Sequence, residues 1–368
     1  MKILFVLENY HPNIGGVETL FRNIAENLVN KGHTVSILTN KLGKDLPSKE
    51  RHGRFTVYRY PFINRYLFTL LAFFPALALS LRHELVHTTS YNAGIPSFFA
   101  GMLTRRRVII TFHEVWGRLW FELPFFCKLK LRLHYHYEQL LLRLPFHRFV
   151  AVSEFTRQQL LDAGVKADKI IRIYNGIDYD KFDALRKKYK PIENDQFTFL
   201  YFGRLGISKG LDVLLRATHL LAQDNSQFKL ILILPLRPKA LFIRIMHLIE
   251  SLSIKNHIGL FHDLSEVDLF EKVSLADCVV IPSYSEGFCF TAVEATALGK
   301  PVVCAHKGAL KEVVSGKHIF FERQDPTDLY SAMIKAIAGK WCENDRKQFK
   351  IEDTVDHYIH LYQQVVRS

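Results

Sequence analysis

Two successive series of short apolar segments, each segment followed by a helical pattern, constrain the fold of this 368-residue chain most strongly. Strands that alternate with helices predict parallel sheets with helices on both faces. The first series contains the candidate strands Lys2–Leu7, Thr34–Thr39, Phe55–Arg59, Leu85–Thr88, Arg107–Phe112, Arg148–Val152 and Ile170–Ile173. The second series contains Phe197–Gly203, Lys229–Leu234, Ile258–Phe261, Asp277–Ile281, Pro301–Cys304 and Ile319–Phe321.

A polar segment, Lys187–Gln196, separates the two series. The chain is longer than one typical domain and long enough for two. We therefore expect an α/β protein with two Rossmann-like, doubly wound parallel-sheet domains, at residues 1–180 and 181–350. Residues 351–368 have a helical pattern, and the sequence leaves open whether this helix crosses back to the first domain.

The excess of positive charge lies in the first half of the chain. Residues 1–190 contain 29 Lys and Arg against 15 Asp and Glu, whereas residues 191–368 contain 20 against 21. Such a basic region attracts nucleic acid, an anionic membrane or an anionic substrate. Because the sequence has no nucleic-acid-binding signature, we expect no nucleic acid partner.

The cysteines and the apolar segments bear on the cellular location. The five cysteines include no CxxC pair, which indicates reduced thiols in the cytoplasm. The first ten residues read as a buried strand and not as a signal peptide. One long uncharged stretch, Tyr66–Leu81, has 16 residues and is interrupted by Pro75. A spanning helix needs about 20 apolar residues, so this stretch predicts a buried or interfacial helix.

The strongest candidate site follows the strand that ends at Ile281. Glu286 and Gly287 form a loop there, and a helix is expected to begin near Thr291. The free N–H groups of a helix start bind anions, and Gly287 permits close approach to a ligand. Glu286 and Glu294 are placed to hold two parts of one ligand, such as the hydroxyls of a sugar and a ribose. For Glu294, a capping box with Thr291 is an equally good interpretation.

A second candidate segment supplies cations. Arg204 follows the strand that ends in Gly203, and Lys209 precedes another helix start. A planar guanidinium and a point charge at this edge of a sheet suit a diphosphate. Taken alone, the two side chains are equally typical of solvated loop charges.

The first half contributes weaker candidates. Gly15 and Gly16 lie between the first strand and the first helix, where a loop can approach a substrate. Their spacing is not GxGxxG, so a dinucleotide site is not predicted. His113 lies just past the strand Arg107–Phe112 and could donate a hydrogen bond to a sugar.

Together these segments resemble the family 4 retaining glycosyltransferases with the GT-B fold. Glu286 and Glu294 match the E-x7-E signature of that family. The resemblance continues in order through GGVE, FHE, VAVSEFTR, NGID, GRLGISKG and ADCVVIPS, and so covers most of the chain. It implies two facing Rossmann-like domains with a cleft, an N-terminal acceptor domain and a C-terminal donor domain.

The resemblance also implies roles for single residues. Arg204 and Lys209 would contact the diphosphate of a UDP- or GDP-sugar, and Glu286 would hold hydroxyls of the transferred hexose. Glu294 would bind the ribose, and the backbone of Gly287, Phe288, Cys289, Phe290 and Thr291 would surround the sugar and phosphate. In the first domain, His113 would lie beside the sugar, and Gly15 and Gly16 near the phosphates. The resemblance also implies a reaction without a metal or other cofactor.

Two departures from the family pattern concern the sugar pocket. Cys289 stands where a Gly usually follows the EGF triplet, and Lys307-Gly308 replaces a Gly-Gly pair. By the resemblance, the acceptor hydroxyl attacks on the face from which the diphosphate leaves. The leaving phosphate, and not a side chain, would take up the proton.

The basic first half is expected to face the acceptor. Tyr66–Leu81 and Leu119–Leu133 interleave apolar residues with cations, and Arg105, Arg106 and Arg107 are near in sequence. Such a surface can bind anionic lipid head groups, so we expect a peripheral enzyme at the cytoplasmic membrane face with a lipid-linked saccharide or other glycan as acceptor. Buried helix faces are the competing interpretation of the same residues.

Two other functions are compatible with this fold. A sugar-nucleotide epimerase would bind the same donor but would not need a basic, aromatic acceptor domain. A catalytically degenerate partner subunit would be expected to have lost some of Arg204, Lys209, Glu286 and Glu294, all of which are present.

Overall fold

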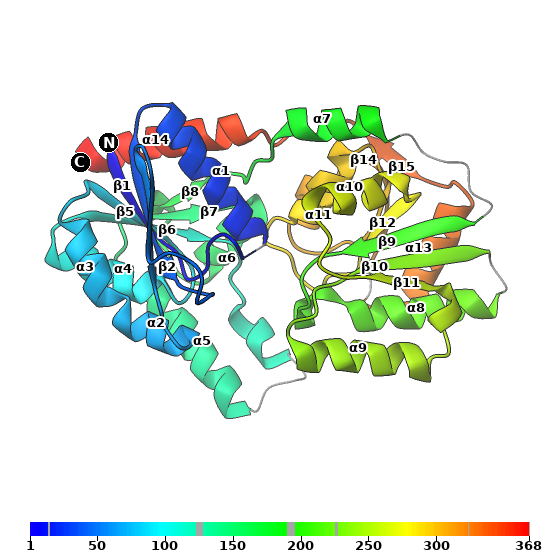
Figure 1. The fold of residues 1–368 in the computed structure, drawn as a ribbon. Coiled ribbons are helices and arrows are strands. Elements are labelled where there is room, and N and C mark those ends of the chain that lie inside the picture. Colours follow the sequence, from blue (N-terminus) through cyan, green and yellow to red (C-terminus); the bar gives the residue numbers. More distant parts are fainter. Residues whose placement is uncertain (14, 123–127, 190–195, 225–226, 323, 368) are drawn as a thin grey trace. The chain divides into compact units, whose positions relative to one another are not determined.

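The computed structural model describes residues 1–13, 15–122, 128–189, 196–224, 227–322 and 324–367 (Figure 1). The chain forms two compact units. Unit 1 comprises Met1–Gly176 and Phe349–Ser368, and unit 2 comprises Ile177–Gln348.

Unit 1 is built on an eight-stranded sheet with the order β3-β4-β2-β1-β5-β6-β7-β8. All neighbouring strands are parallel except the edge pair β3 and β4. The strands are β1 (Lys2–Val6), β2 (Thr34–Asn40), β3 (Lys49–His52), β4 (Phe55–Tyr60), β5 (Leu85–Thr89), β6 (Arg107–Phe112), β7 (Arg148–Ala151) and β8 (Ile170–Arg172).

Helices cover both faces of this sheet (Figure 1). One face carries α2 (Arg65–Leu71), α3 (Phe73–Ser80), α4 (Gly94–Leu103) and α5 (Lys128–Arg143). The other carries α1 (Gly16–Asn30) and α14 (Ile351–Arg367), and α6 (Glu154–Asp162) and the short helices η1 (Gly117–Glu122) and η2 (Ala167–Lys169) complete the unit.

In strand β1, successive side chains pack alternately into the apolar layers on the two faces of the sheet. Leu4 and Val6 belong to the buried cluster that also contains Phe68 of α2. On the opposite face, the Phe5 ring lies edge-on to Phe21 of α1, with ring centroids 5.3 Å apart. Because successive side chains of a strand point to opposite faces, a strand with a helical layer on each side must be apolar throughout.

The C-terminal helix α14 is fixed to unit 1 by buried hydrogen bonds. The His87 Nδ1 atom lies 2.6 Å from the Tyr362 hydroxyl, and its Nε2 atom lies 2.8 Å from Thr111 Oγ1. Thr111 Oγ1 in turn lies 3.1 Å from the Tyr358 hydroxyl. Burial lowers the pKa of His87 to about 3, so the imidazole is neutral and has one donor and one acceptor nitrogen.

Unit 2 contains a seven-stranded sheet with the order β11-β10-β9-β12-β13-β14-β15. Only the edge pair β14 and β15 is antiparallel among its neighbouring strands. The strands are β9 (Phe197–Phe202), β10 (Phe228–Ile233), β11 (Ile258–Phe261), β12 (Cys278–Ile281), β13 (Val302–Ala305), β14 (Gly316–Phe321) and β15 (Cys342–Asn344).

Helices again lie on both sides of the sheet (Figure 1). One group contains α8 (Leu211–Gln223), α9 (Lys239–Ser251) and α13 (Pro326–Ile337). The other contains α7 (Tyr179–Lys188), α10 (Glu266–Leu275) and α11 (Phe290–Ala297). Shorter helical turns are η3 (Ile207–Lys209), η4 (Lys255–His257) and α12 (Leu310–Val313).

These two sheets confirm the predicted α/β class and all thirteen predicted strands, most of them with bounds that match or differ by one residue. Strand β14 begins at Gly316, three residues before the predicted start. The long uncharged stretch forms two short helices, α2 and α3, and no helix in the described ranges is long and apolar enough to cross a membrane.

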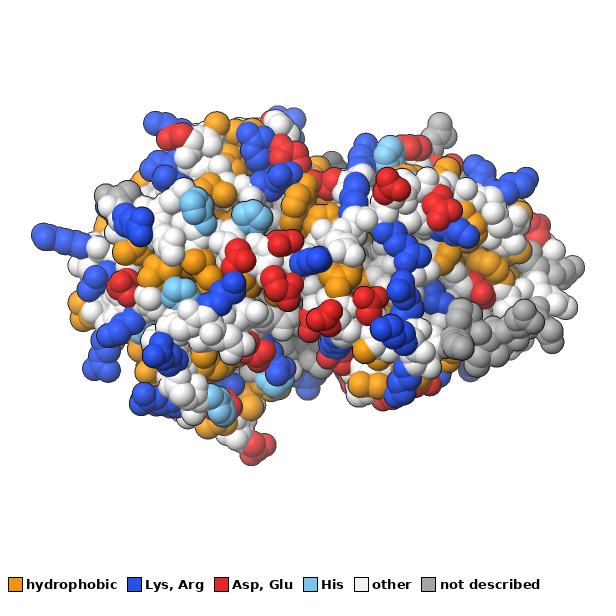
Figure 2. Space-filling view, turned by 90° about the horizontal axis from the view of Figure 1, so that it is seen from above, with side chains coloured by type: hydrophobic (Ala, Val, Ile, Leu, Met, Phe, Trp, Pro, Cys, Tyr) orange, Lys and Arg blue, Asp and Glu red, His pale blue; other side chains and the backbone are white. Residues whose placement is uncertain are grey.

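Basic side chains do not gather in one place on the face drawn in Figure 2. Figure 2 shows one face, on which Lys and Arg side chains lie singly or in small groups among acidic and apolar ones. In unit 1 some of them pair with carboxylates, as Arg65 does with Glu8 at 3.2 Å and Arg59 with Glu50 at 2.7 Å. The positive excess of the first half therefore forms no continuous patch on the face drawn in Figure 2.

The buried hydrogen bond between His87 and Tyr362 yields a prediction for stability. The Tyr362→Phe variant leaves one imidazole nitrogen buried without a partner, which costs about 1–3 kcal/mol. We expect the free energy of unfolding, measured by urea denaturation, to fall by that amount. Tyr60→Phe removes an exposed hydroxyl and is the matched control. Equal stabilities of the two variants would show that the hydrogen bond between His87 and Tyr362 does not stabilise the fold.

Candidate functional site

The candidate residues of unit 2 lie in two loops that follow neighbouring strands. Strands β9 and β12 are hydrogen-bonded in parallel, so their carboxyl ends lie at the same edge of the sheet. The loop after β9 contains Arg204 and Lys209, and the loop after β12 contains Glu286. Ligands of open parallel sheets bind at this edge.

Lys209 and Glu286 are in direct contact. Lys209 Nζ donates to Glu286 Oε1 over 2.7 Å, and Ser283 Oγ donates to the same oxygen over 2.7 Å. The side chains of Lys209 and Glu286 are 26% and 11% exposed, so the ion pair is largely shielded from water but still reachable. The structure thus brings together the cation and the carboxylate that the sequence placed 77 residues apart.

A close backbone contact holds the two loops together. Gly210 has φ +64°, and a Cβ atom built there would lie 1.9 Å from the carbonyl oxygen of Pro282. The Tyr284 amide also donates to the Ser208 carbonyl over 2.7 Å. Only glycine combines this left-handed backbone with this approach, and the contact places Lys209 next to the Glu286 loop.

Arg204 is less constrained than Lys209. It follows Gly203 directly after β9, and its side chain is exposed. Within the described residues its guanidinium forms no ion pair or hydrogen bond. It lies at the same edge of the sheet as Lys209, where its charge is available to an anionic ligand.

The helix α11 begins immediately after the Glu286 loop. It starts at Phe290, one residue before the expected position, and Cys289 precedes it with φ +75° and ψ +79°. No described side chain caps the first N–H groups of α11. The capping-box interpretation of Glu294 is therefore wrong: Thr291 is inside the helix, and Glu294 lies in the second turn and not in the first.

The Glu294 carboxylate is poorly solvated. Burial, and then the nearby Glu266, raise the pKa of Glu294 to about 7, while Lys181 opposes the shift. Among the described residues no hydrogen-bond donor reaches this carboxylate. A desolvated carboxylate without donors gains most from a ligand that supplies hydroxyl groups.

The two departures from the family pattern occur at unusual backbone conformations. Cys289 has positive φ, which is uncommon for a residue other than glycine. Gly308 also has positive φ, at +55°. Burial raises the pKa of the Cys289 thiol well above its usual range, so this side chain is a small apolar group and not a nucleophile.

The remaining candidates belong to unit 1. Gly15 is the N-cap residue of α1, with its carbonyl accepting from the Thr19 amide, and Gly16 is the first residue of that helix. His113 directly follows β6 and is half-buried, with its ring centroid 6.2 Å from that of Phe21. Gly15 and His113 thus lie in loops after parallel strands, and Gly16 begins the helix that follows its loop.

Two contributors to the site were not predicted from the sequence. Ser283 is not among the predicted site residues, although its spacing of three from Glu286 is a usable signal. Tyr201 is buried in β9, and burial together with Glu286 raises the pKa of its hydroxyl. In the described part of the chain, no group of three or more His, Cys, Asp or Glu residues is arranged to hold a metal ion.

The raised pKa of Glu294 predicts a pH dependence of stability. Between pH 4.5 and 7 the folded protein retains a proton on Glu294 that the unfolded chain has lost, so stability falls as pH rises through this range. We expect Glu294→Gln to match the wild type near pH 4.5 and to be more stable above pH 7, by up to about 3 kcal/mol at roughly 1.36 kcal/mol per pKa unit.

Thermal unfolding between about pH 4.5 and 8 measures this effect. Glu312→Gln, which makes the same change in the short helix α12, is the control. If the stabilities of the wild type and Glu294→Gln differed by the same amount at every pH in this range, the raised pKa of Glu294 would be refuted.

Comparisons with known proteins agree with this architecture. The model of Glycosyltransferase Family 4 matches residues 14–181, and that of Glycosyl transferases group 1 matches residues 182–353. An uncharacterized glycosyltransferase of Methanocaldococcus jannaschii is 26% identical over 85% of this chain and 83% of its own. A phosphatidylinositol N-acetylglucosaminyltransferase chain of Arabidopsis thaliana is 21% identical over 92% of this chain and 74% of its own.

Solved structures share the whole fold. The Anabaena protein HepE in complex with UDP and glucose superposes with a TM-score of 0.73 at 19% identity, covering 99% of this chain and 100% of its own. With its two parallel-sheet units, this chain has the GT-B fold. The chain belongs to the family 4 glycosyltransferases.

Proposed function

We propose that the protein is a retaining, metal-independent hexosyltransferase that uses a UDP- or GDP-sugar. The observation that carries the proposal is the contact between Lys209 and Glu286 in front of the uncapped start of α11. This arrangement offers a cation, a carboxylate and free N–H groups within one small region. Those three groups match a diphosphate joined to a polyhydroxyl ring.

Each group has a distinct task in this proposal. Lys209 and Arg204 neutralise the diphosphate, whose negative charge grows as the sugar leaves. Glu286 accepts hydrogen bonds from the hexose, while Ser283 and Lys209 fix its orientation. Glu294 accepts from the ribose hydroxyls, which supply the donors that its carboxylate lacks in the free protein.

The proposal also accounts for the proton. The acceptor hydroxyl loses its proton as it bonds to the anomeric carbon, and a phosphate oxygen that leaves from the same face can take that proton. Glu286 is committed to Lys209 and Ser283, so it is poorly suited to act as a covalent nucleophile. For His113, Gly15 and Gly16 of unit 1, the roles that the family resemblance implies, beside the sugar and near the phosphates, are kept as proposals.

A thermal-shift screen of nucleoside diphosphates and nucleotide sugars tests the donor site. A ligand at about 100 times its dissociation constant stabilises the fold by roughly 2.7 kcal/mol. We expect UDP- or GDP-compounds to produce such a shift. Lys209→Gln should reduce the shift for both the diphosphate and the sugar nucleotide, because it removes a contact to the shared phosphates.

The Glu286→Gln variant distinguishes recognition of the sugar from recognition of the phosphates. This variant should lower the transfer rate about 100-fold or more and weaken binding of the sugar nucleotide, but it should leave binding of the free diphosphate intact. Glu250→Gln, on the exposed side of α9, is the matched control. Undiminished transfer by Glu286→Gln would exclude this site assignment.

We further propose that the acceptor is lipid-linked and that unit 1 binds the cytoplasmic membrane face peripherally. Several apolar side chains of α2, of α3 and of the segment before them are not buried as helix faces: Ile63, Leu70 and Phe74 are 88%, 68% and 64% exposed. Helices α2 and α3 both pack against α4, where Met102 and Leu103 are also exposed.

Cations surround this apolar surface. Arg65 begins α2, Arg82 follows α3, and residues 105–107 follow α4 as three consecutive arginines. Apolar side chains flanked by cations suit anionic lipid. Leu119–Leu133 was also expected to contribute to the membrane-binding surface. Part of it, residues 123–127, lies outside the described ranges. The Arabidopsis relative described above acts on phosphatidylinositol by its name, which supports a lipid acceptor.

Vesicle sedimentation tests the membrane proposal. We expect binding to vesicles that contain anionic lipid at low salt and weaker binding at high salt. Leu70→Ser with Phe74→Ser should reduce binding at least about tenfold, because two exposed apolar side chains are lost. Leu236→Ser with Ile243→Ser makes the same change on unit 2 and should have no effect. Absence of sedimentation at low salt would refute the proposal.

A further inference from the structure

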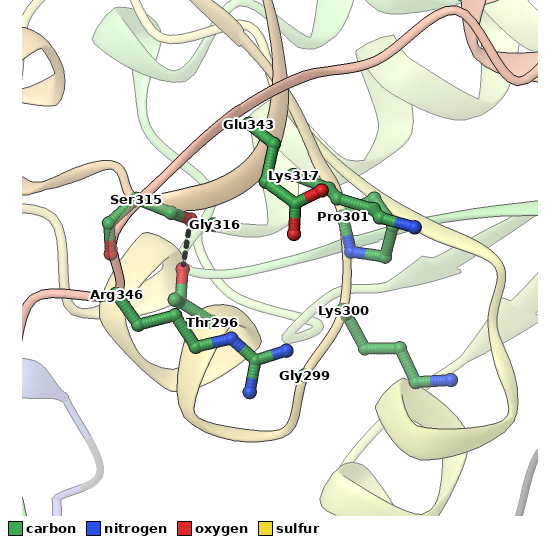
Figure 3. Close-up of a pocket in the computed structure, with 9 residues that line it drawn as sticks. All are labelled: Thr296, Gly299, Lys300, Pro301, Ser315, Gly316, Lys317, Glu343 and Arg346. Atoms are coloured by element: carbon green, nitrogen blue, oxygen red, sulfur yellow. Dashed lines mark hydrogen bonds between the residues drawn. The ribbon is translucent and has the colours of Figure 1, made fainter.

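A polar cavity of about 200 Å³ lies in unit 2 at the end of α11 that is opposite to the candidate donor site (Figure 3). The loop after α11, the start of β14 and the segment around β15 surround it. Its lining residues are Thr296, Gly299, Lys300, Pro301, Ser315, Gly316, Lys317, Glu343 and Arg346.

The cavity has more positive than negative charge. Lys300, Lys317 and Arg346 contribute three cations, and Glu343 is the single carboxylate among its lining residues. Lys317 and Glu343 are register partners in β14 and β15, yet no ion pair within 4.0 Å joins them. None of the three cationic side chains forms a hydrogen bond or ion pair with another described residue.

Arg346 lies over two glycines. Cβ atoms built at Gly299 and Gly316 would lie 3.7 Å and 3.6 Å from atoms of the Arg346 side chain. Both glycines have positive φ, at +76° and +72°, so the backbone keeps this wall free of side chains. Figure 3 shows the Arg346 guanidinium directed toward Gly299.

A second guanidinium is close by. The Arg186 side chain of α7 also comes within 3.7 Å of the Cβ position at Gly299. Thr296 and Arg346 line an adjoining cavity of about 160 Å³ together with Arg186. Burial lowers the pKa of Lys300, which shows that this ammonium group is poorly solvated. Arg186 pairs with Asp183 at 3.5 Å, and Glu343 lines the first cavity, but the cations around the two cavities outnumber the carboxylates. A bound anion stabilises such an excess of positive charge.

We propose that this cavity binds a phosphate group, either as inorganic phosphate or as part of a small phosphorylated metabolite. Arg346 provides a planar fork of donors and the two lysines provide point charges, the combination that suits phosphate oxygens. The volume is below the roughly 300 Å³ of typical pockets for drug-sized ligands, which favours a small group over a whole nucleotide.

This site is distinct from the candidate donor site. Helix α11 has eight residues and is therefore about 12 Å long. The Glu286 loop precedes its first residue, whereas Thr296 in its last turn lines the cavity. The inference does not depend on the proposed function, because it uses no residue of the donor site.

Isothermal titration calorimetry of the full chain with inorganic phosphate, and separately with glucose 6-phosphate, tests the inference. Arg346→Gln combined with Lys317→Gln should weaken binding at least about tenfold, because two of the phosphate's cationic partners are lost. Arg216→Gln combined with Lys335→Gln removes the same charges from α8 and α13, away from the cavity, and should bind like the wild type. Arg204→Gln should also bind like the wild type, because it alters only the donor site.

The pattern of binding among these variants either supports or overturns the phosphate site. Loss of binding in Arg346→Gln/Lys317→Gln with retention in the other two variants supports the site, provided that circular dichroism shows an intact fold. Binding that is lost in Arg204→Gln and retained in Arg346→Gln/Lys317→Gln would place the phosphate in the donor site and overturn the inference. Absence of binding to the wild type at millimolar concentrations of either ligand would overturn it as well. The stronger of the two ligands distinguishes free phosphate from a phosphorylated metabolite.

Discussion

The approach of Gly210 to the Pro282 carbonyl is the constraint on which the candidate site depends. It joins two loops that follow neighbouring parallel strands, and it leaves no room for any side chain at position 210. Lys209 is carried next to Glu286 as a result, and the ion pair forms before any ligand arrives. The site is therefore largely organised by the backbone, which lowers the entropic cost of binding.

Most of the fold could be predicted from the sequence because parallel strands buried on both faces leave continuous apolar runs. The two strands that were missed, β3 and β15, lack such runs. They are short, antiparallel edge strands with charged sequences, KERH and CEN, and their side chains are largely exposed. Edge strands pair along one side only, so their sequences carry little periodic signal.

The candidate site was predictable to a similar extent. Residue type and position after a strand identified Lys209 and Glu286, but not the hydrogen bond from Ser283, which depends on the turn between them. The role of Thr291 was misjudged because the helix begins one residue earlier, after a cysteine in a left-handed conformation. A glycine-like backbone at a non-glycine residue leaves no trace in a sequence pattern.

The return of α14 to unit 1 has a consequence for biosynthesis. Residues 1–176 leave the ribosome before unit 2, but the sheet face around Phe5 and His87 lacks the covering helix α14 until residues 351–367 are made. Unit 2 is complete at residue 348 and has its whole core available earlier. Unit 1 thus finishes folding after unit 2 although most of it is translated before unit 2, and a fragment ending at residue 176 would expose apolar surface that favours aggregation.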